Sequence, residues 1–145
     1  MNAVSNGPYA NSGYQILEDR NFKQCGPLAG LLTAFSFAKS IGSETVLTAP
    51  IDTPFLPRTL LRDLIDAGSP AIAASRGRVH PLCGLWAVAL QTDLEKALDQ
   101  GIRSATAWSE LCGANMVEFA LENGRDPFFN INTEEDLAYA QSIAK

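Results

Sequence analysis

The chain has 145 residues, a length that fits one domain with a single hydrophobic core. Hydrophobic residues make up 46% of the sequence and the formal net charge is −5, which indicates a globular protein and argues against a generic nucleic-acid binder. No run approaches the roughly 20 apolar residues of a membrane helix, and the N-terminus lacks the basic flank and apolar stretch of a secretory signal. We therefore expect a cytoplasmic protein without a membrane or nucleic-acid partner.

The first half of the chain predicts two helices with one strand between them. Apolar residues recur at spacings of three and four between Leu28 and Ala38, on one face of a helix that should end near Gly42. Residues 45–49 are short, β-branched and apolar, which predicts a parallel strand buried on both faces. The next helix should end near Gly68 and carry its apolar residues at Leu60, Leu61, Leu64 and Ile65.

The second half predicts the same alternation. We expect strands at residues 71–74, 82–88 and 115–119, and helices at residues 90–98 and 108–111. Thr133 should cap the last helix, because three acidic residues follow it in the first turn. The apolar face of that helix should comprise Leu137, Ala140, Ile143 and Ala144. Strands alternating with helices imply an α/β fold, a Rossmann-like and mostly parallel sheet with flanking helices.

Asp52 is the most informative single residue of the sequence. It follows the strand predicted at residues 45–49, and ligands of open α/β sheets bind beyond the carboxyl ends of the strands. A carboxylate held there between Pro50 and Pro54 can ligate Mg²⁺ that bridges nucleotide phosphates. From its position alone, an aspartate that begins the next turn or caps the following helix is an equal alternative.

Two further segments are candidates for contact with a ligand. Residues 26–30 (GPLAG) precede a predicted helix, whose free amides can face an anion. Asn130 and Asn132 lie two apart in a stretch that should be extended, so their side chains should point to the same side, each with a donor and an acceptor. The plainer alternatives are ordinary helix punctuation at residues 26–30, and a turn in which Asn132 or Thr133 caps the helix.

His80 is the only histidine of the sequence. No serine or cysteine stands in a recognisable nucleophile setting, so a structural role or a substrate contact is favoured over catalysis. Cys25, Cys83 and Cys112 are too widely spaced for a zinc or redox motif, which predicts buried or bystander thiols.

Four segments, taken in order, resemble one family. They read GPLAG at 26–30, PIDTPFLP at 50–57, HPLCGLW at 80–86 and DPFFNINT at 126–133. Any one of them alone would be weak, but together they resemble the molybdenum cofactor guanylyltransferases, the MobA family. The resemblance runs over the whole chain, which we therefore expect to be one nucleotidyltransferase domain at residues 1–145.

The resemblance implies a reaction and a set of site residues. Members transfer the guanylyl group of GTP to the phosphate of molybdopterin and release pyrophosphate, with Mg²⁺ as cofactor; contacts with a molybdoenzyme or a chaperone are compatible with this role. Asp52 matches the aspartate that ligates Mg²⁺, and Asp19 matches one that contacts the guanine nucleotide. Asn130 and Asn132 match a pair at the reaction site. The residues that would shape the pocket floor are Gly26, Pro27, Leu28, Ala29 and Gly30.

One element of the family pattern does not occur in these 145 residues. Members open with a strand and a glycine-rich loop of the form G-G-x-S-x-R-M-G-x-D-K, which supplies phosphate-binding amides, an arginine and a lysine. The missing strand would lie centrally in the sheet, so we expect unpaired strand edges. Loss of preorganised groups of this kind costs orders of magnitude in rate. We therefore expect the chain alone to turn over little or no GTP.

Other interpretations stay open at this stage. The sequence could be a truncated gene model or a partial copy of a guanylyltransferase. It could be a non-catalytic remnant that binds a pterin, a nucleotide or a partner chain. It could also be a cytidylyltransferase for the same cofactor or a sugar-phosphate nucleotidyltransferase, because the residues that read the base lie mostly in the absent segment.

Overall fold

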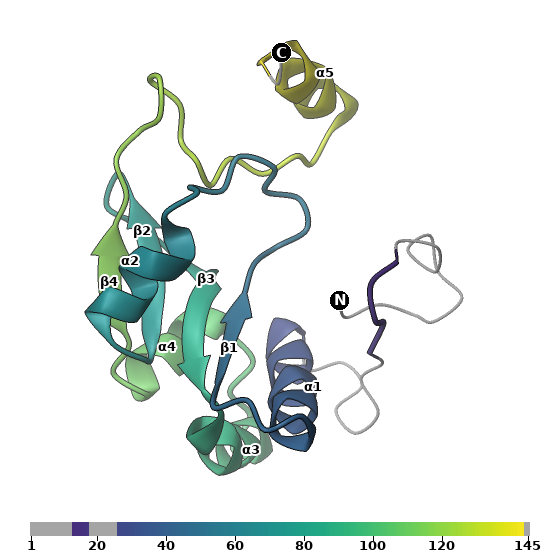
Figure 1. The fold of residues 1–145 in the computed structure, drawn as a ribbon, viewed down its shortest axis with the longest axis vertical. Helices are drawn as coiled ribbons and strands as arrows, with labels where there is room; N and C mark the ends of the chain where they lie inside the picture. Colours follow the sequence, from purple (N-terminus) through teal and green to yellow (C-terminus); the bar gives the residue numbers. More distant parts are fainter. Residues whose placement is uncertain (1–12, 18–25, 144–145) are drawn as a thin grey trace. The chain divides into compact units, whose positions relative to one another are not determined.

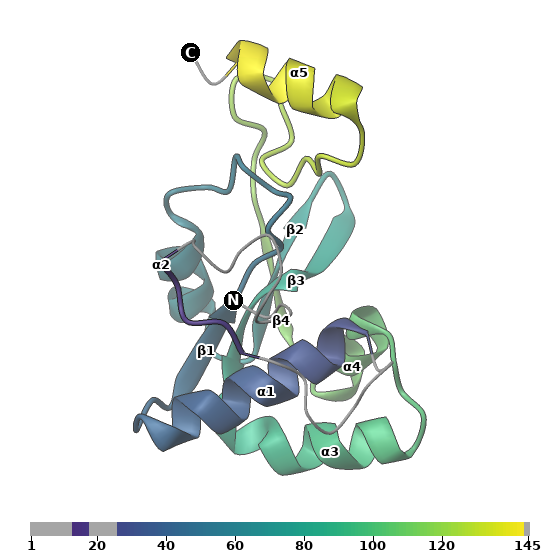
Figure 2. The same cartoon turned by 90° about the vertical axis from the view of Figure 1, so that its right-hand side faces the viewer.

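The computed structural model describes residues 13–17 and 26–143 of the chain. Figure 1 labels its elements, and Figure 2 shows them from the side. In chain order they are α1 (Pro27–Ser40), β1 (Thr45–Thr48), α2 (Leu60–Ala67), β2 (Ala71–Ser75), β3 (Arg78–Ala87), the 3-10 turn η1 (Val88–Leu90), α3 (Gln91–Asp99), α4 (Ala105–Leu111), β4 (Asn115–Glu118) and α5 (Glu134–Ile143). This alternation confirms the predicted α/β fold class.

The described residues form two compact units. One comprises the described residues up to Val46 together with Trp86–Cys112, and the other comprises Leu47–Leu85 with the described residues from Gly113 onward. In the first unit α1 packs on α3, and the predicted buried face of α1 is confirmed. The buried residues of this unit are Leu28, Ala29, Leu31, Leu32, Phe35 and Ala38 of α1, Leu94, Ala97 and Leu98 of α3, and Trp86, Ala105 and Trp108.

The described strands form one sheet in the order β1-β3-β2-β4. β2 pairs with β3 in antiparallel and with β4 in parallel orientation, so these pairings are mixed where a mostly parallel sheet was expected. The cause is a two-residue turn at Arg76 and Gly77, whose φ angles of 52° and 73° are those of a type I′ hairpin. Because the turn is so short, β3 begins at Arg78 rather than at Leu82 as predicted.

The ladder between β2 and β3 is interrupted beside His80. Ile72 faces Gly84, but the next residue of β2, Ala73, faces His80, so the residues of β3 between His80 and Gly84 bulge out of the ladder. Pro81 lies in this bulge, where its missing N–H costs no ladder hydrogen bond. Bulges redirect the side chains around them, and this one redirects the segment that carries His80 and Cys83.

β1 does not have the burial that its sequence predicts. Its residues alternate between exposed and half-buried, and Leu47 is 41% exposed. In the described sheet β1 is an edge strand. The prediction of a strand buried on both faces is therefore wrong for the described residues, because β-branched composition reports local propensity and not the cover that a strand receives.

α2 packs on β2 and β4 in the second unit. Leu60 and Leu64, four apart, are 5% and 0% exposed, whereas Leu61 and Ile65 are 47% and 56% exposed. Only half of the predicted apolar face is therefore buried, because residues one position farther round the helix point away from the sheet. The core of this unit consists of Leu60, Leu64, Ala71, Ala73, Cys83, Leu85, Phe119 and Phe128.

α5 begins directly after Thr133, as predicted. Of its predicted apolar face Ala140 is buried, Ile143 is half-buried and Leu137 is 45% exposed. Ala144 lies outside the described residues. None of the described helices is long and apolar enough to cross a membrane.

Replacing Leu64 by alanine should lower the free energy of unfolding by about 2–5 kcal/mol, because it opens a cavity in the core of the second unit. Leu61→Ala is the matched control on the same helix and should change stability by less than about 0.5 kcal/mol, since Leu61 is exposed. Urea denaturation of both variants measures the difference. Equal losses would contradict the observed orientation of α2.

Candidate functional site

The structure brings the side chains of Asp52 and Asn130 close together. Asp52 lies in the turn after β1, and its carbonyl oxygen accepts a hydrogen bond from the Ile131 N–H at 2.9 Å. The side-chain amide of Asn130 lies 3.5 Å from Asp52 Oδ2. Within the turn, the buried Thr53 donates its hydroxyl to the Pro50 carbonyl at 2.8 Å. The main chain thus fixes both loops, and the Asp52 carboxylate keeps most of its acceptor capacity for a ligand.

Asn132 contributes its backbone to the cap of α5. Its N–H and that of Thr133 donate to Asp136 Oδ2 at 3.0 and 2.9 Å, and the Asp136 N–H donates to Thr133 Oγ1 at 3.1 Å. These reciprocal bonds make a capping box. The backbone bond from Asn132 and the bonds with Thr133 lower the pKa of Asp136. The plainer interpretation, that Thr133 caps the helix, is therefore correct, and the exposed Asn132 side chain stays outside this cap.

Ser75, at the end of β2, is the centre of a polar network that the sequence did not reveal. Although it is 0% exposed, its hydroxyl donates to Asp126 Oδ1 at 2.9 Å and lies 2.8 Å from His80 Nε2. Because the hydroxyl proton goes to Asp126, the imidazole must carry a proton on Nε2 and donate it to Ser75.

This order of groups is not that of a hydrolase triad. In a triad the histidine lies between the aspartate and the serine and removes the serine proton. Here Ser75 lies between His80 and Asp126, so the histidine donates to the serine and cannot activate it. The network is structural, in agreement with the preference for a non-catalytic His80.

Asp126 connects the loop before α5 to β2 and β3. Its Oδ1 also accepts the Phe128 N–H at 2.9 Å, and the Phe128 ring stacks on His80 with 4.5 Å between ring centroids and 18° between planes. Phe119 of the same core meets Phe128 edge-on at 5.5 Å. Both the backbone and the ring of this segment are therefore fixed, two residues before Asn130.

The surroundings of Cys83 make it an unreactive thiol. It is 1% exposed, and burial, with a smaller contribution from the Asp52 charge, raises its pKa to about 12. Because the thiolate is the form that binds metals and attacks electrophiles, Cys83 is neither a metal ligand nor a nucleophile at neutral pH. This confirms the prediction of a buried thiol for Cys83; Cys25 lies outside the described residues.

The other residues predicted for the site fall outside the described residues or in the other compact unit. Asp19 is outside the described residues. Residues 26–30 begin α1 in the first unit, whereas Asp52 belongs to the second, so their place in one site stays a prediction. Leu28 and Ala29 are 1% and 3% exposed and serve the core of their unit. Only the backbone of this segment and its glycines and proline remain available to a ligand.

The donor set around Asp52 fits a cation that keeps much of its hydration. No group of three or more histidine, cysteine or acidic side chains that could hold a metal occurs in the described part of the chain, which excludes a closed structural zinc site there. Mg²⁺ is commonly bound by one or two carboxylates, with water and substrate phosphates completing its shell. Asp52, half-buried and next to the Asn130 amide, can supply one such ligand.

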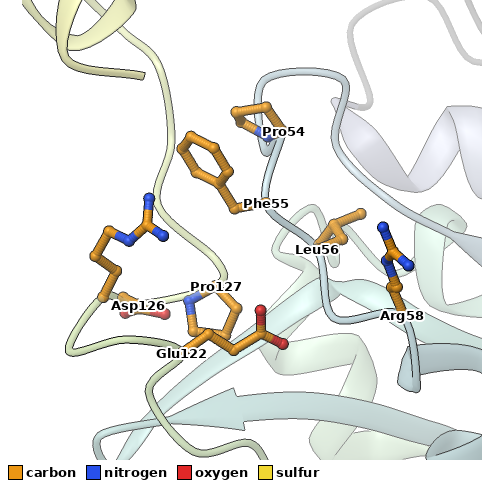
Figure 3. Close-up of a pocket in the computed structure, with 8 residues that line it drawn as sticks. Pro54, Phe55, Leu56, Arg58, Glu122, Asp126 and Pro127 are labelled. Carbon is orange, nitrogen blue, oxygen red and sulfur yellow. The ribbon is translucent and has the colours of Figure 1, made fainter. Parts of the chain in front are cut away.

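A pocket of about 270 Å³ lies on the same two loops. Figure 3 shows side chains of the segment after Asp52 on one side and of the segment before Asn130 on the other. Its lining residues are Pro54, Phe55, Leu56, Arg58, Glu122, Arg125, Asp126 and Pro127.

An α/β sheet with a carboxylate in the turn after a strand, next to an amide from a second loop, belongs to the class of α/β domains that bind ligands beyond the ends of their strands. The model of the family described as "MobA-like NTP transferase domain" matches residues 3–116 of the chain. The chain belongs to the MobA-like NTP transferase family, and thus to the nucleotidyltransferases.

Curated relatives and solved structures agree with this assignment. The chain is 44% identical to the molybdenum cofactor guanylyltransferase of Acidiphilium cryptum over 135 residues, which cover 92% of this chain and 67% of the relative. For the protein of the same name from Cereibacter sphaeroides the identity is 39% over 139 residues, 94% of this chain and 69% of the relative.

Among solved structures, a molybdopterin-guanine dinucleotide biosynthesis protein A from Archaeoglobus fulgidus has a TM-score of 0.64 at 27% sequence identity. The match covers 93% of this chain and 71% of the Archaeoglobus chain. A protein from Aquifex aeolicus has a TM-score of 0.72 at 26% sequence identity. The match covers 87% of this chain and 66% of the Aquifex protein. The chain spans about two thirds of the length of these relatives.

Replacing Ser75 by alanine should cost about 1–3 kcal/mol of unfolding free energy, because it leaves the His80 donor and an Asp126 acceptor without their buried partner. Ser69→Ala removes only a long bond of 3.4 Å to the Leu85 carbonyl from an exposed residue and serves as the control. Chemical denaturation compares the two. A loss at Ser75 no larger than at Ser69 would show that the network contributes little to stability.

His80 should make stability fall in mild acid. Burial lowers its pKa below 6.5, against a smaller opposing effect of Asp126. Above pH 6.5 neither the folded nor the unfolded chain binds this proton, so the contribution of neutral His80 is fully present. As the pH falls below 6.5 the unfolded chain is protonated first, and stability is lost until the pH has passed below the folded-state pKa.

Unfolding free energies at about pH 7.5 and about pH 5.5 test this linkage. His80→Gln keeps a donor for Ser75 but does not titrate, and no other histidine is present to mask the effect. The variant should lose less stability over this interval than the wild type. Parallel pH profiles of the two proteins would contradict the expectation.

Proposed function

We propose that this chain carries the metal-binding and acceptor side of a molybdenum cofactor guanylyltransferase site. The observation that carries the proposal is the meeting of Asp52 and Asn130 on two loops joined by the Ile131–Asp52 backbone hydrogen bond. The names of the relatives support GTP as donor and molybdopterin as acceptor. They favour GTP over CTP, and a biosynthetic enzyme over a binding remnant; a cytoplasmic location is part of the proposal.

In the proposed reaction, a phosphate oxygen of molybdopterin forms a bond to the α-phosphorus of GTP. The bond from that phosphorus to the oxygen shared with the β-phosphate breaks, and pyrophosphate leaves with the electron pair. Such a reaction depends mainly on positioning and on neutralisation of negative charge. A divalent cation, for which we propose Mg²⁺, supplies that neutralisation when bound.

The residues of this chain have separate tasks in the proposal. Asp52 holds the cation through its carboxylate, and the Asn130 amide, 3.5 Å away, orients that carboxylate or the acceptor phosphate. Asn132, exposed at the start of α5, is a second contact for the acceptor. Asp19 is assigned to the guanine nucleotide, and the backbone at residues 26–30 to the floor of the site.

We also propose that residues 1–145 belong to one nucleotidyltransferase domain. The matched family region, residues 3–116, runs through both compact units. The glycine-rich loop of the family is absent from the sequence, so turnover is best measured in a protein that carries such a loop ahead of these residues.

Replacing Asp52 by asparagine should weaken Mn²⁺ binding in the presence of GTP by about tenfold or more, because it removes a charged ligand from a sparse donor set. Mn²⁺ is the probe, since its electron paramagnetic resonance reports binding directly in the 145-residue chain. In a protein extended by the glycine-rich loop, the same change should lower guanylyl transfer by about 100-fold or more.

Asp66→Asn is the matched control, because Asp66 is an exposed carboxylate on α2 of the same unit. It should leave metal binding and transfer unchanged. If Asp52→Asn and Asp66→Asn behaved alike in both assays, the metal assignment would be wrong. If the extended protein transferred CMP from CTP in preference to GMP from GTP, the donor assignment would be wrong.

A further inference from the structure

A second tight turn builds one wall of the pocket on the Asp52 and Asn130 loops. Asn123 and Gly124 have φ angles of 52° and 78°, and the residues on either side exchange backbone hydrogen bonds, Arg125 N–H to Glu122 oxygen at 3.0 Å and Glu122 N–H to Arg125 oxygen at 2.9 Å. Directly opposed residues of an antiparallel pair present their side chains on one face. The acidic side chain of Glu122 and the basic side chain of Arg125 therefore project from the same face of this turn, and both line the pocket.

These two opposite charges do not pair with each other. The ion pairs found among the described residues join Arg62 with Asp63 and Lys96 with Asp93. The Arg125 guanidinium instead lies over the Phe55 ring, 5.5 Å from its centroid. Its Nη1 is buried and has no hydrogen-bond partner in the described part of the chain. A buried charged donor without an acceptor is costly, and Arg125 lines the pocket, where its guanidinium has no anionic partner among the described residues.

The charges around the pocket favour a neutral polar ligand over a phosphate. Arg58 and Arg125 are matched by the carboxylates of Glu122 and Asp126. The Asp126 carboxylate is already engaged by Ser75 and by the Phe128 N–H, whereas no bond of the Glu122 carboxylate occurs within the described residues. A ligand in this pocket therefore meets one carboxylate without a bond within the described residues, Glu122, and two guanidinium groups without an ion pair there, Arg58 and Arg125.

The size of the pocket and its apolar walls favour a small ring. Pro54, Leu56 and Pro127 form apolar walls (Figure 3). The volume of about 270 Å³ lies just below the roughly 300–1,000 Å³ of pockets that hold drug-sized ligands. The pocket can thus hold one bicyclic ring, but not a whole nucleoside triphosphate.

We propose that this pocket binds a 2-amino-4-oxopyrimidine ring, the chemistry that pterins and guanine share. Glu122 accepts hydrogen bonds from the amino group and the adjacent ring N–H, and the Arg125 guanidinium donates to the oxo oxygen. The assignment rests on the proposed function, whose two substrates both contain such a ring. Because Asp52 and Asn130 lie on the same loops, a ring held here places its substituent chain beside the reacting phosphates.

Binding of small rings to the 145-residue chain tests this proposal without any turnover. The probes are 6-hydroxymethylpterin, guanosine, and lumazine, a pteridine that has an oxo group in place of the 2-amino group. Fluorescence of the pteridines and calorimetry with guanosine report affinity. We expect 6-hydroxymethylpterin or guanosine to bind, and lumazine to bind about tenfold more weakly or worse, because it presents an oxygen to Glu122.

The Glu122→Gln and Arg125→Gln variants should each weaken the ring that binds by about tenfold or more. Glu122 is exposed, so its variant should keep the wild-type melting temperature and remain informative even if Arg125→Gln disturbs the fold. Arg62→Gln, an exposed arginine on α2, is the control and should bind as the wild type does.

Each outcome decides one point. If neither ring binds, if lumazine binds as well as 6-hydroxymethylpterin, or if Glu122→Gln binds like Arg62→Gln, the assignment is overturned. Preference for 6-hydroxymethylpterin assigns the pocket to the acceptor, and preference for guanosine assigns it to the donor. Ring binding that persists in an extended protein without guanylyl transfer would count against the proposed function alone.

Discussion

The hydrogen bond from the Ser75 hydroxyl to Asp126 is the interaction on which the candidate site depends. It lies at the buried end of β2 and joins residues that are far apart in the sequence. Buried polar groups are stable only when they are satisfied, and here three groups satisfy one another, since His80 donates to Ser75 and Asp126 also receives the Phe128 N–H. The loop that follows has little freedom left when it reaches Asn130.

Asp52 is positioned in a way that leaves its carboxylate open to a cation. Its position is fixed by main-chain atoms, through its carbonyl oxygen and the Ile131 N–H, and not by partners of its carboxylate. A carboxylate that is positioned but not saturated with hydrogen bonds can bind a cation that keeps several of its waters. Next to it the Cys83 thiol is buried and protonated, so the site offers oxygen ligands to a hard cation rather than sulfur to a soft one.

Much of the fold was predictable because it follows from the local spacing of apolar residues. The buried face of α1 and the cap at Thr133 follow from spacing and residue type. The burial of β1 and of Leu61 and Ile65 was not predictable, because it depends on which faces receive cover. The antiparallel β2–β3 pairing depends on the conformation of Arg76 and Gly77. In the sequence this turn is marked only by one glycine.

The site shows the same division between local and distant information. Asp52 and Asn130 could be proposed from motifs, and the structure brings them together. The Ser75 network and the unpaired Arg125 could not be predicted, because each depends on contacts between distant segments. Asp126 stood in a motif, but its partner at Ser75 lies 51 residues away, beyond the reach of any spacing rule.

The discontinuity of the second unit has a consequence for how the protein is made. Within the second unit Leu47–Leu85 is synthesised first, but its partner strand β4 and the Asp126 loop come only after Trp86–Cys112, which belongs to the other unit. Contacts that close over long stretches of chain form late and slowly. During synthesis the first unit can therefore acquire its core while Ser75 and the apolar residues of β2 still wait for their partners. The contact between Ser75 and Asp126 can therefore form only after most of the described chain has been synthesised, and until then the exposed apolar residues of the second unit favour association.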